Sequence, residues 1–291
     1  MKYKSVHFII EAPTSELLST MRDLVAAAAG EAGFEAFQET NDGCQGYIQE
    51  KLFDKQLLDE KLDEINLSDC KVSYSVSSVE DKDWNANWEE QGFSPISIGD
   101  SMVIYDKVHT SEQELALMNA PIKIGIEARQ AFGTGTHETT RMILATLTEQ
   151  ELQGKRVLDC GCGTGILGIA ASKLGADEVV AYDIDEWSVK NTKHNAEINH
   201  VNNIEVYEGD CHILSHINGM FDVVLANINR NILLHDLESF CGVMSSESIL
   251  VMSGFYEADI PSIMNKASSM GLREDGRKLD SNWCCLTLKK E

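Results

Sequence analysis

The sequence predicts an α/β fold in two parts, a small α+β module and a larger doubly wound sheet of seven strands. Two observations carry this prediction. Residues 1–79 follow the order strand, helix, strand, strand, helix, strand, which is that of a ferredoxin-like module. After Arg156, short apolar runs alternate regularly with helical patterns, which indicates parallel strands with helices on both faces of a sheet. Residues 80–108, which begin with the polar segment 80–87, are predicted to link this module to a domain spanning 109–291.

Each element of the small module rests on the spacing of its apolar residues. Alternating apolar residues indicate strands, and apolar residues three and four positions apart indicate helices. The first helix places six apolar residues at helical spacing, and we assign them to the core: Leu17, Leu18, Met21, Leu24, Val25 and Ala28. The expected elements are strand 3–10, helix 14–30, strands 34–39 and 44–50, helix 54–65 and strand 71–78.

The larger domain follows the same two periodicities. Two short strands, 102–105 and 122–126, and a helix over 139–149 are expected before the sheet. The expected strands of the sheet are 156–159, 178–183, 204–208, 223–227, 248–253, 273–278 and 283–289. The expected helices between them are 166–174, 188–199, 232–241 and 260–271. No helix separates the last two strands, so they are predicted to form a hairpin-like pair.

A glycine loop, residues 159–165, follows the first strand of the sheet and precedes a helix of small residues. Glycines let the backbone turn tightly and approach a ligand closely. A dinucleotide fingerprint would place its third glycine at Ile166, but here it falls at Gly165. This spacing, with Asp159 two positions before the first glycine, looks like a site for S-adenosylmethionine (SAM) rather than NAD. A tight strand-to-helix turn without any ligand is the alternative.

Two strand ends and an upstream loop supply further candidate site residues. The second strand ends at Asp183, whose carboxylate could accept hydrogen bonds from both hydroxyls of a ribose. The fourth strand ends at Asn227, where it would open onto the same cleft. Upstream, a glycine-threonine loop (residues 131–140) runs into a helix, and its Phe132 and Thr140 could cover a cofactor.

The segment after the third strand offers one further candidate and one rejected site. Asp210 could contact the amino group of an adenine, with a turn or helix-cap role as the alternative. Cys211, His212 and His216 are the nearest approach to a metal-ligand cluster. They lack a second close-spaced pair of ligands, so we predict no metal.

Composition and charge limit the class of protein. The 291 residues contain no apolar run of 18, and residues 1–11 lack the long apolar core of a signal peptide, so a cytoplasmic protein without membrane association is expected. None of the eight cysteines forms a C-x-x-C pair, which favours reduced thiols. The net charge of −23 opposes binding to nucleic acid and favours a cationic partner, although acidity can also serve solubility alone.

Taken together, the motifs resemble the ribosomal protein L11 methyltransferase family (PrmA). The resemblance rests on the glycine-threonine loop, the glycine loop, the strand end at 183–185, the turn at 226–228 and the linker residues Asp83, Trp84, Trp88, Phe93 and Pro95. It spans roughly 83 to 283, and the small module agrees in topology only. It implies a Rossmann-like domain that transfers methyl groups from SAM to lysine side chains and the α-amine of large-subunit ribosomal protein L11. It also implies that residues 1–79 bind that basic protein and are joined flexibly to the catalytic domain; we expect a monomer.

Matching motif positions assigns SAM contacts to Thr140, Gly161, Asp183 and Asn227. From the chemistry of the residues we add Gly163, Phe132 and Asp210, and we expect the loop glycines to let backbone N–H groups approach the carboxylate of SAM. The chain departs from the family at Glu138, where proline is usual, and at Asn229 and Arg230, which replace smaller residues. These departures bear on substrate preference rather than on the cofactor.

Methyl transfer to an amine needs a neutral, correctly aimed nitrogen. We hypothesise that the side-chain oxygen of Asn227 and nearby backbone carbonyls accept the amine's hydrogens, with no dedicated general base. His137 could relay a proton, but an orienting role is favoured.

Two other functions fit parts of the pattern. An asparagine-led turn also serves enzymes that methylate the adenine amino group of RNA or DNA. That class typically has Pro-Pro-aromatic after the asparagine, whereas Ile228, Asn229 and Arg230 stand here, and the charge opposes it. The other is a SAM-binding protein without catalysis, which the intact loops disfavour.

Overall fold

The computed structural model describes residues 3–34, 36–65, 70–78, 92–128 and 133–291. The chain divides into two compact units, residues 1–83 and 84–291. We describe each unit by itself, beginning with the smaller one.

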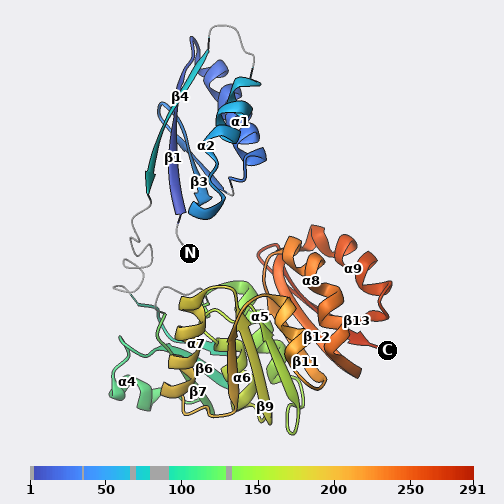
Figure 1. Cartoon of the computed structure of the whole chain (residues 1–291). Coiled ribbons are helices and arrows are strands. Elements are labelled where there is room, and N and C mark those ends of the chain that lie inside the picture. The colour runs from blue at the N-terminus through green and yellow to red at the C-terminus, as the bar shows by residue number, and fades with distance from the viewer. Residues whose placement is uncertain (1–2, 35, 66–69, 79–91, 129–132) are drawn as a thin grey trace. The chain divides into compact units, whose positions relative to one another are not determined.

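The smaller unit is a four-stranded antiparallel sheet with two helices on one face, as Figure 1 shows. Its strand order is β2-β3-β1-β4, so the predicted ferredoxin-like order of elements is present. The elements are β1 (Tyr3–Glu11), α1 (Ser15–Glu31), β2 (Ala36–Thr40), β3 (Gly43–Gln49), the short 3₁₀ helix η1 (Glu50–Leu52), α2 (Lys55–Asp63) and β4 (Lys71–Ser78).

Helix α1 begins where Thr14 caps it, since the Thr14 side chain accepts a hydrogen bond from the Leu17 N–H at 3.2 Å. Its buried stripe runs through Met21, Val25 and Ala29, which are four residues apart and belong to the core of this unit. The prediction that Leu24 lies in the core was wrong: Leu24 is 37% exposed. Leu24 immediately precedes Val25, so a turn of about 100° per residue moves it away from the stripe.

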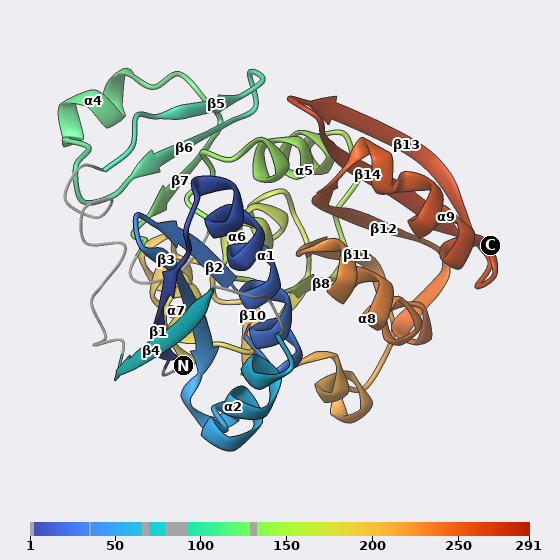
Figure 2. The same cartoon turned by 90° about the horizontal axis from the view of Figure 1, so that it is seen from above.

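The larger unit contains the predicted seven-stranded sheet, in the order β10-β9-β8-β11-β12-β14-β13. The first five strands of this order are parallel, and β14 is antiparallel to β12 and β13, between which it lies (Figure 2). The strands are β8 (Arg156–Cys160), β9 (Glu178–Asp183), β10 (Ile204–Glu208), β11 (Phe221–Asn227), β12 (Met244–Tyr256), β13 (Leu272–Asp280) and β14 (Trp283–Lys290). The helices are α5 (Glu138–Thr148), α6 (Ile166–Lys173), α7 (Glu186–Ile198), α8 (Arg230–Val243) and α9 (Ile260–Ser268), with 3₁₀ turns η2 (Cys211–His216) and η3 (Glu257–Asp259).

Successive residues of the strands alternate between two hydrophobic cores, one on each face of the sheet. Val157 and Val223 belong to the core that includes residues of α5 and α6. Leu158 and Val224 belong to the other core, with residues of α8 and α9. This alternation is what a doubly wound sheet requires, because both of its faces are covered.

A three-stranded sheet precedes the main one, and Figure 2 shows it with the short helix α4 (Glu112–Leu117). Its strands are β5 (Ile96–Ile98), β6 (Met102–Asp106) and β7 (Ile122–Ile126). From the sequence, we assigned the residues of both β5 and β6 to the linker 80–108, although we expected a short strand at 102–105. Both belong to the larger unit because Ile98, Met102 and Ile104 are buried in its core. The predicted linker residues Trp84 and Trp88 lie outside the described residues.

All eight cysteines lie among the described residues, and each carries a free thiol, as predicted. Seven of them are buried, including Cys160 and Cys162 in the glycine loop. Within the described part of the chain, no helix is long and apolar enough to cross a membrane.

Candidate active site

The candidate site lies at the carboxyl ends of β8, β9 and β11. In the strand order, β9 and β10 lie on one side of β8, and β11 and β12 lie on the other. The switch point of the topology is therefore between β8 and β11. Ligands of doubly wound sheets bind at such a point. The structure therefore brings the predicted glycine loop, Asp183 and Asn227 to one edge of the sheet.

The glycine loop is fixed to β9 by its own backbone. The N–H groups of Gly161 and Cys162 donate to the Tyr182 carbonyl at 2.9 and 3.0 Å. Gly161 has φ of 68°, and an added Cβ would lie 2.6 Å from Cγ2 of Ile228, so only glycine fits here without a shift. The loop thus packs directly against the residue that follows Asn227.

The backbone N–H groups of the three loop glycines have partners within the protein, and their approach to the carboxylate of SAM stays a prediction. Gly161 donates to Tyr182, Gly163 donates to Asp183 and Gly165 donates to the Cys162 carbonyl at 2.8 Å. Because each N–H already has a partner inside the loop and β9, the glycines contribute by lacking a side chain, which keeps the loop compact and open to a ligand.

Asp183 and Gly163, both predicted site residues, lie in direct contact. The Gly163 N–H donates to one oxygen of Asp183 at 2.9 Å, and the Asp185 N–H donates to the other at 3.0 Å. A carboxylate has about four acceptor sites, so both oxygens retain capacity for a ribose diol. Burial raises the pKa of Asp183, and the backbone N–H donors oppose that rise.

Asn227 and Thr140, two other predicted site residues, are also joined. The Asn227 side-chain nitrogen donates to the Thr140 hydroxyl at 3.1 Å, although 87 residues separate them in the sequence. Thr140 is buried near the start of α5 and so fixes the direction of the amide. This bond uses the nitrogen of Asn227 and leaves its oxygen to accept hydrogens from a substrate.

An aromatic wall, which we define as His137, Tyr256 and Trp283, stands near the same end of α5. The His137 ring meets Trp283 edge-on at 4.9 Å between centroids, and Tyr256 stacks on Trp283 at 4.3 Å. His137 also caps α5, since its Nδ1 accepts from the Thr139 N–H at 3.3 Å. This cap supports the predicted orienting role. Sequence reasoning did not place Tyr256 and Trp283 beside His137.

The end of β12 connects the aromatic wall to the turn after Asn227. Ser253 pairs with Asn227 in the parallel ladder, three residues before Tyr256. At Gly254, where φ is 97°, an added Cβ would lie 2.4 Å from the Ile228 carbonyl oxygen. The backbone of β12 therefore presses against this turn and sets the separation between Asn227 and Tyr256.

Asp159 is a buried carboxylate beneath the glycine loop. One of its oxygens accepts from the Gly168 N–H at 2.8 Å, while Oδ1 is buried without a hydrogen-bond partner among the described residues. Burial raises the pKa of Asp159 to about 7. A cationic ligand would offset the free-energy cost of burying this oxygen without a partner. SAM carries two cationic groups, an ammonium and a sulfonium. The Asp159 carboxylate thus fits the predicted cofactor.

The raised pKa predicts a pH-dependent stability in the protein without cofactor. The folded state keeps a proton on Asp159 that the unfolded chain releases above its ordinary pKa of 3.8. The free energy of unfolding therefore falls as pH rises from about 4 to 7, by about 1.4 kcal/mol per unit. Urea unfolding at pH 5 and at pH 8 measures this effect. Between these two pH values, we expect the free energy of unfolding of wild type to fall by about 3 kcal/mol more than that of Asp159→Asn. Parallel pH profiles for the two proteins would refute this assignment.

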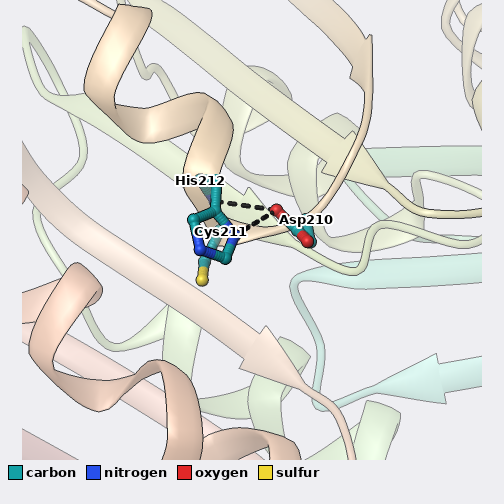
Figure 3. A group of neighbouring side chains, drawn as sticks. All are labelled: Asp210, Cys211 and His212. Atoms are coloured by element: carbon teal, nitrogen blue, oxygen red, sulfur yellow. Dashed lines mark hydrogen bonds and ion pairs between the residues drawn. The ribbon is translucent and has the colours of Figure 1, made fainter.

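Asp210 caps the 3₁₀ turn η2, which is the alternative role that we considered for it. Its carboxylate accepts from the backbone N–H of His212 at 2.9 Å and lies 2.8 Å from the His212 ring, as Figure 3 shows. These hydrogen bonds lower the pKa of Asp210. The ligand atoms of Asp210, Cys211 and His212 lie within 4.8 Å of one another, and the cap accounts for the proximity of Asp210 to His212. Contact with adenine stays a prediction, and Phe132 lies outside the described residues.

Comparison with known proteins gives one consistent result. Residues 15–291 match the family model described as ribosomal protein L11 methyltransferase (PrmA). A ribosomal protein L11 methyltransferase of Phocaeicola vulgatus is 44% identical over 98% of both chains, and one of Porphyromonas gingivalis is 37% identical over 98% of this chain and 97% of its own. A crystal structure of a ribosomal protein L11 methylase from Lactobacillus delbrueckii subsp. bulgaricus covers 68% of this chain and 100% of its own, with 25% identity and a TM-score of 0.59. The chain therefore belongs to the ribosomal protein L11 methyltransferase family, and SAM is its methyl donor.

Proposed function

We propose that this protein methylates amino groups of ribosomal protein L11, at lysine side chains and at the α-amine. The observation that carries the proposal is the contact between Asn227 and Thr140, which leaves an amide oxygen available beside the glycine loop. An acceptor placed there suits a nitrogen nucleophile. The names of the relatives support L11 as the substrate.

We place the cofactor against the glycine loop, with its ribose on Asp183 and its cationic end toward Asp159. Asp183 suits the ribose because two backbone donors fix its carboxylate while both oxygens keep acceptor sites. Bound here, SAM supplies a methyl group on a positively charged sulfur. Thr140, Gly161, Gly163 and Asn227 surround this position, and Phe132 and Asp210 are the predicted contacts at its edges.

The chain's own residues must make the substrate amine neutral and aim it. A lysine with an ordinary pKa of about 10.4 costs roughly 4 to 5 kcal/mol to deprotonate at neutral pH. An apolar surface such as the aromatic wall lowers the pKa of an amine by excluding water. The Asn227 oxygen then accepts a hydrogen from the amine and directs its lone pair toward the cofactor. Because His137 Nδ1 caps α5, we assign His137 to orientation rather than proton transfer.

The remaining features of the enzyme follow the same proposal. We assign substrate recognition to residues 1–79, and we propose that the protein acts in the cytoplasm as a monomer without binding nucleic acid directly. The net charge of −23 supports a basic protein as partner, because opposite charges speed and favour their encounter.

Intact-mass spectrometry of unmethylated L11 incubated with this protein and SAM tests the proposal directly. We expect gains in whole methyl steps, and peptide mapping should place them on lysine side chains and the α-amine. A parallel reaction with the Asn227→Ala variant controls for methylation by contaminants. An unchanged L11 mass, in the presence of measurable SAM binding, would refute L11 as the substrate.

A further inference from the structure

Helix α7 and its C-cap residue present a row of buried side-chain amides at four-residue spacing, Asn191, Asn195 and Asn199. Their exposed fractions are 3%, 0% and 5%. Buried amides are costly unless they are hydrogen-bonded. Asn199 satisfies this requirement on β7, because it accepts from the Gly125 N–H at 2.9 Å and donates to the Gly125 carbonyl at 2.6 Å. The row thus binds the free edge groups of β7 much as a neighbouring strand would.

Asn195 makes the corresponding contacts one step further along the strand. Its oxygen accepts from the Glu127 N–H at 3.0 Å, and its nitrogen donates to the Glu127 carbonyl at 3.2 Å. Glu127 is the first residue after β7, on the way to the glycine-threonine loop. Asn195 therefore holds the point where that segment leaves the sheet.

Unlike Asn199, Asn195 also reaches the glycine loop. Its nitrogen donates to the Thr164 carbonyl at 2.9 Å. Thr164 is fully buried, and its hydroxyl donates to the Gly133 carbonyl at 2.5 Å. A continuous set of hydrogen bonds therefore runs from Glu127 through Asn195 and Thr164 to Gly133. It ties both described ends of this segment to the loop on which we place SAM.

Thr192 lies one helical turn before Asn195 on the same side of α7, and it also bonds the glycine loop. The Thr192 hydroxyl donates to the Gly163 carbonyl at 2.9 Å, and Gly163 in turn donates to Asp183. The loop that contacts the Asp183 carboxylate is thus also held by α7. Asn195 joins this loop to the end of β7 through the Thr164 carbonyl, whereas Asn199 bonds β7 without reaching the loop.

We propose that Asn195 is a positioning residue for cofactor binding, which it serves by fixing the glycine loop against the end of β7. The proposal rests on our placement of SAM at that loop. Loss of the Asn195 side chain should therefore weaken SAM binding, although Asn195 itself does not touch the cofactor. The turnover number at saturating SAM should change little, because the groups that aim the amine lie on β11 and α5.

The structure supplies a matched control in Asn199. Asn195→Ala and Asn199→Ala both remove a buried amide from α7 and two hydrogen bonds to the backbone of β7 or its end, so both should lower the thermal unfolding midpoint. Only Asn195→Ala cuts the link to Thr164. We expect it to raise the Kd of SAM, measured by isothermal titration calorimetry, about 5- to 30-fold, and we expect Asn199→Ala to change it less than about 3-fold.

Equal increases in Kd for the two variants would show a structural effect alone and overturn the proposal. Should Asn195→Ala not fold, Asn195→Leu removes the same amide, and with it the hydrogen bond to the Thr164 carbonyl, while filling a similar space; an unchanged Kd in that variant would also overturn the proposal. A failure of the underlying cofactor placement is distinguishable, because Asp183→Ala would then leave SAM binding intact.

Discussion

Replacing Asp183 with alanine is expected to raise the Kd of SAM at least about 100-fold. The ribose would lose two hydrogen bonds to a charged acceptor, each worth about 1.5 to 3 kcal/mol. The Gly163 and Asp185 N–H groups would also lose their common partner, which loosens the loop. Isothermal titration calorimetry with SAM measures this loss directly.

Two further variants isolate the cause. Asp183→Asn keeps the shape of the side chain but removes the charge and one acceptor oxygen. Its Kd for SAM should therefore lie between those of wild type and Asp183→Ala. Asp185→Ala lies two residues away and removes a cap, since the Asp185 carboxylate accepts from the Ser188 N–H at 3.2 Å. It should lower stability by about 1 kcal/mol and leave the Kd of SAM near that of wild type. Equal losses of affinity at 183 and 185 would contradict our placement of the ribose.

Replacing Asn227 with alanine is expected to reduce kcat for L11 methylation by about 100-fold or more. The variant loses the acceptor that aims the amine, and the loss of one such preorganised polar group in an active site costs about this factor. Affinity for SAM should fall less than about 10-fold, because Asp183 and the glycine loop remain. Single-turnover kinetics at saturating SAM separates these two effects.

Asn229→Ala provides the matched control, because Asn229 lies in the same turn but serves another purpose. Its side chain caps α8 by accepting from the N–H groups of Asn231 and Ile232, each at 3.1 Å. The expected result is lower thermal stability with nearly normal kcat. Full turnover in Asn227→Ala, or an equal loss in Asn229→Ala, would remove Asn227 from the mechanism.

Much of the fold could be predicted because its apolar residues keep strict periods. The expected strands 178–183 and 204–208 coincide with β9 and β10 at both ends. The convergence of the predicted site residues has a related reason. Parallel strands end at one edge of a sheet, so residues at strand ends, such as Asp183 and Asn227, must converge there whatever their separation in sequence.

Features that depend on long-range packing could not be predicted in this way. The aromatic wall joins His137 to Tyr256 and Trp283 through the antiparallel pairing of β12 with β14, and no spacing in the sequence encodes that contact. The partners of the loop N–H groups were equally hidden, because the Tyr182 carbonyl that engages Gly161 belongs to another strand. A buried amide such as Asn195 resembles a surface asparagine until its surroundings are known.

The two cysteines that flank Gly161 have a chemical consequence for the cofactor loop. Thiols react with oxidants and alkylating agents as thiolates. Burial raises the pKa of both Cys160 and Cys162 well above the ordinary value of a thiol, so at physiological pH both stay protonated. Both are compact, polarisable side chains that pack into the core, Cys160 with residues of α8 and α9 and Cys162 with Val189 of α7 and Val206 of β10. A motif that carries sulfur on either side of its first glycine can thus hold a reactive methyl donor without offering it a competing nucleophile.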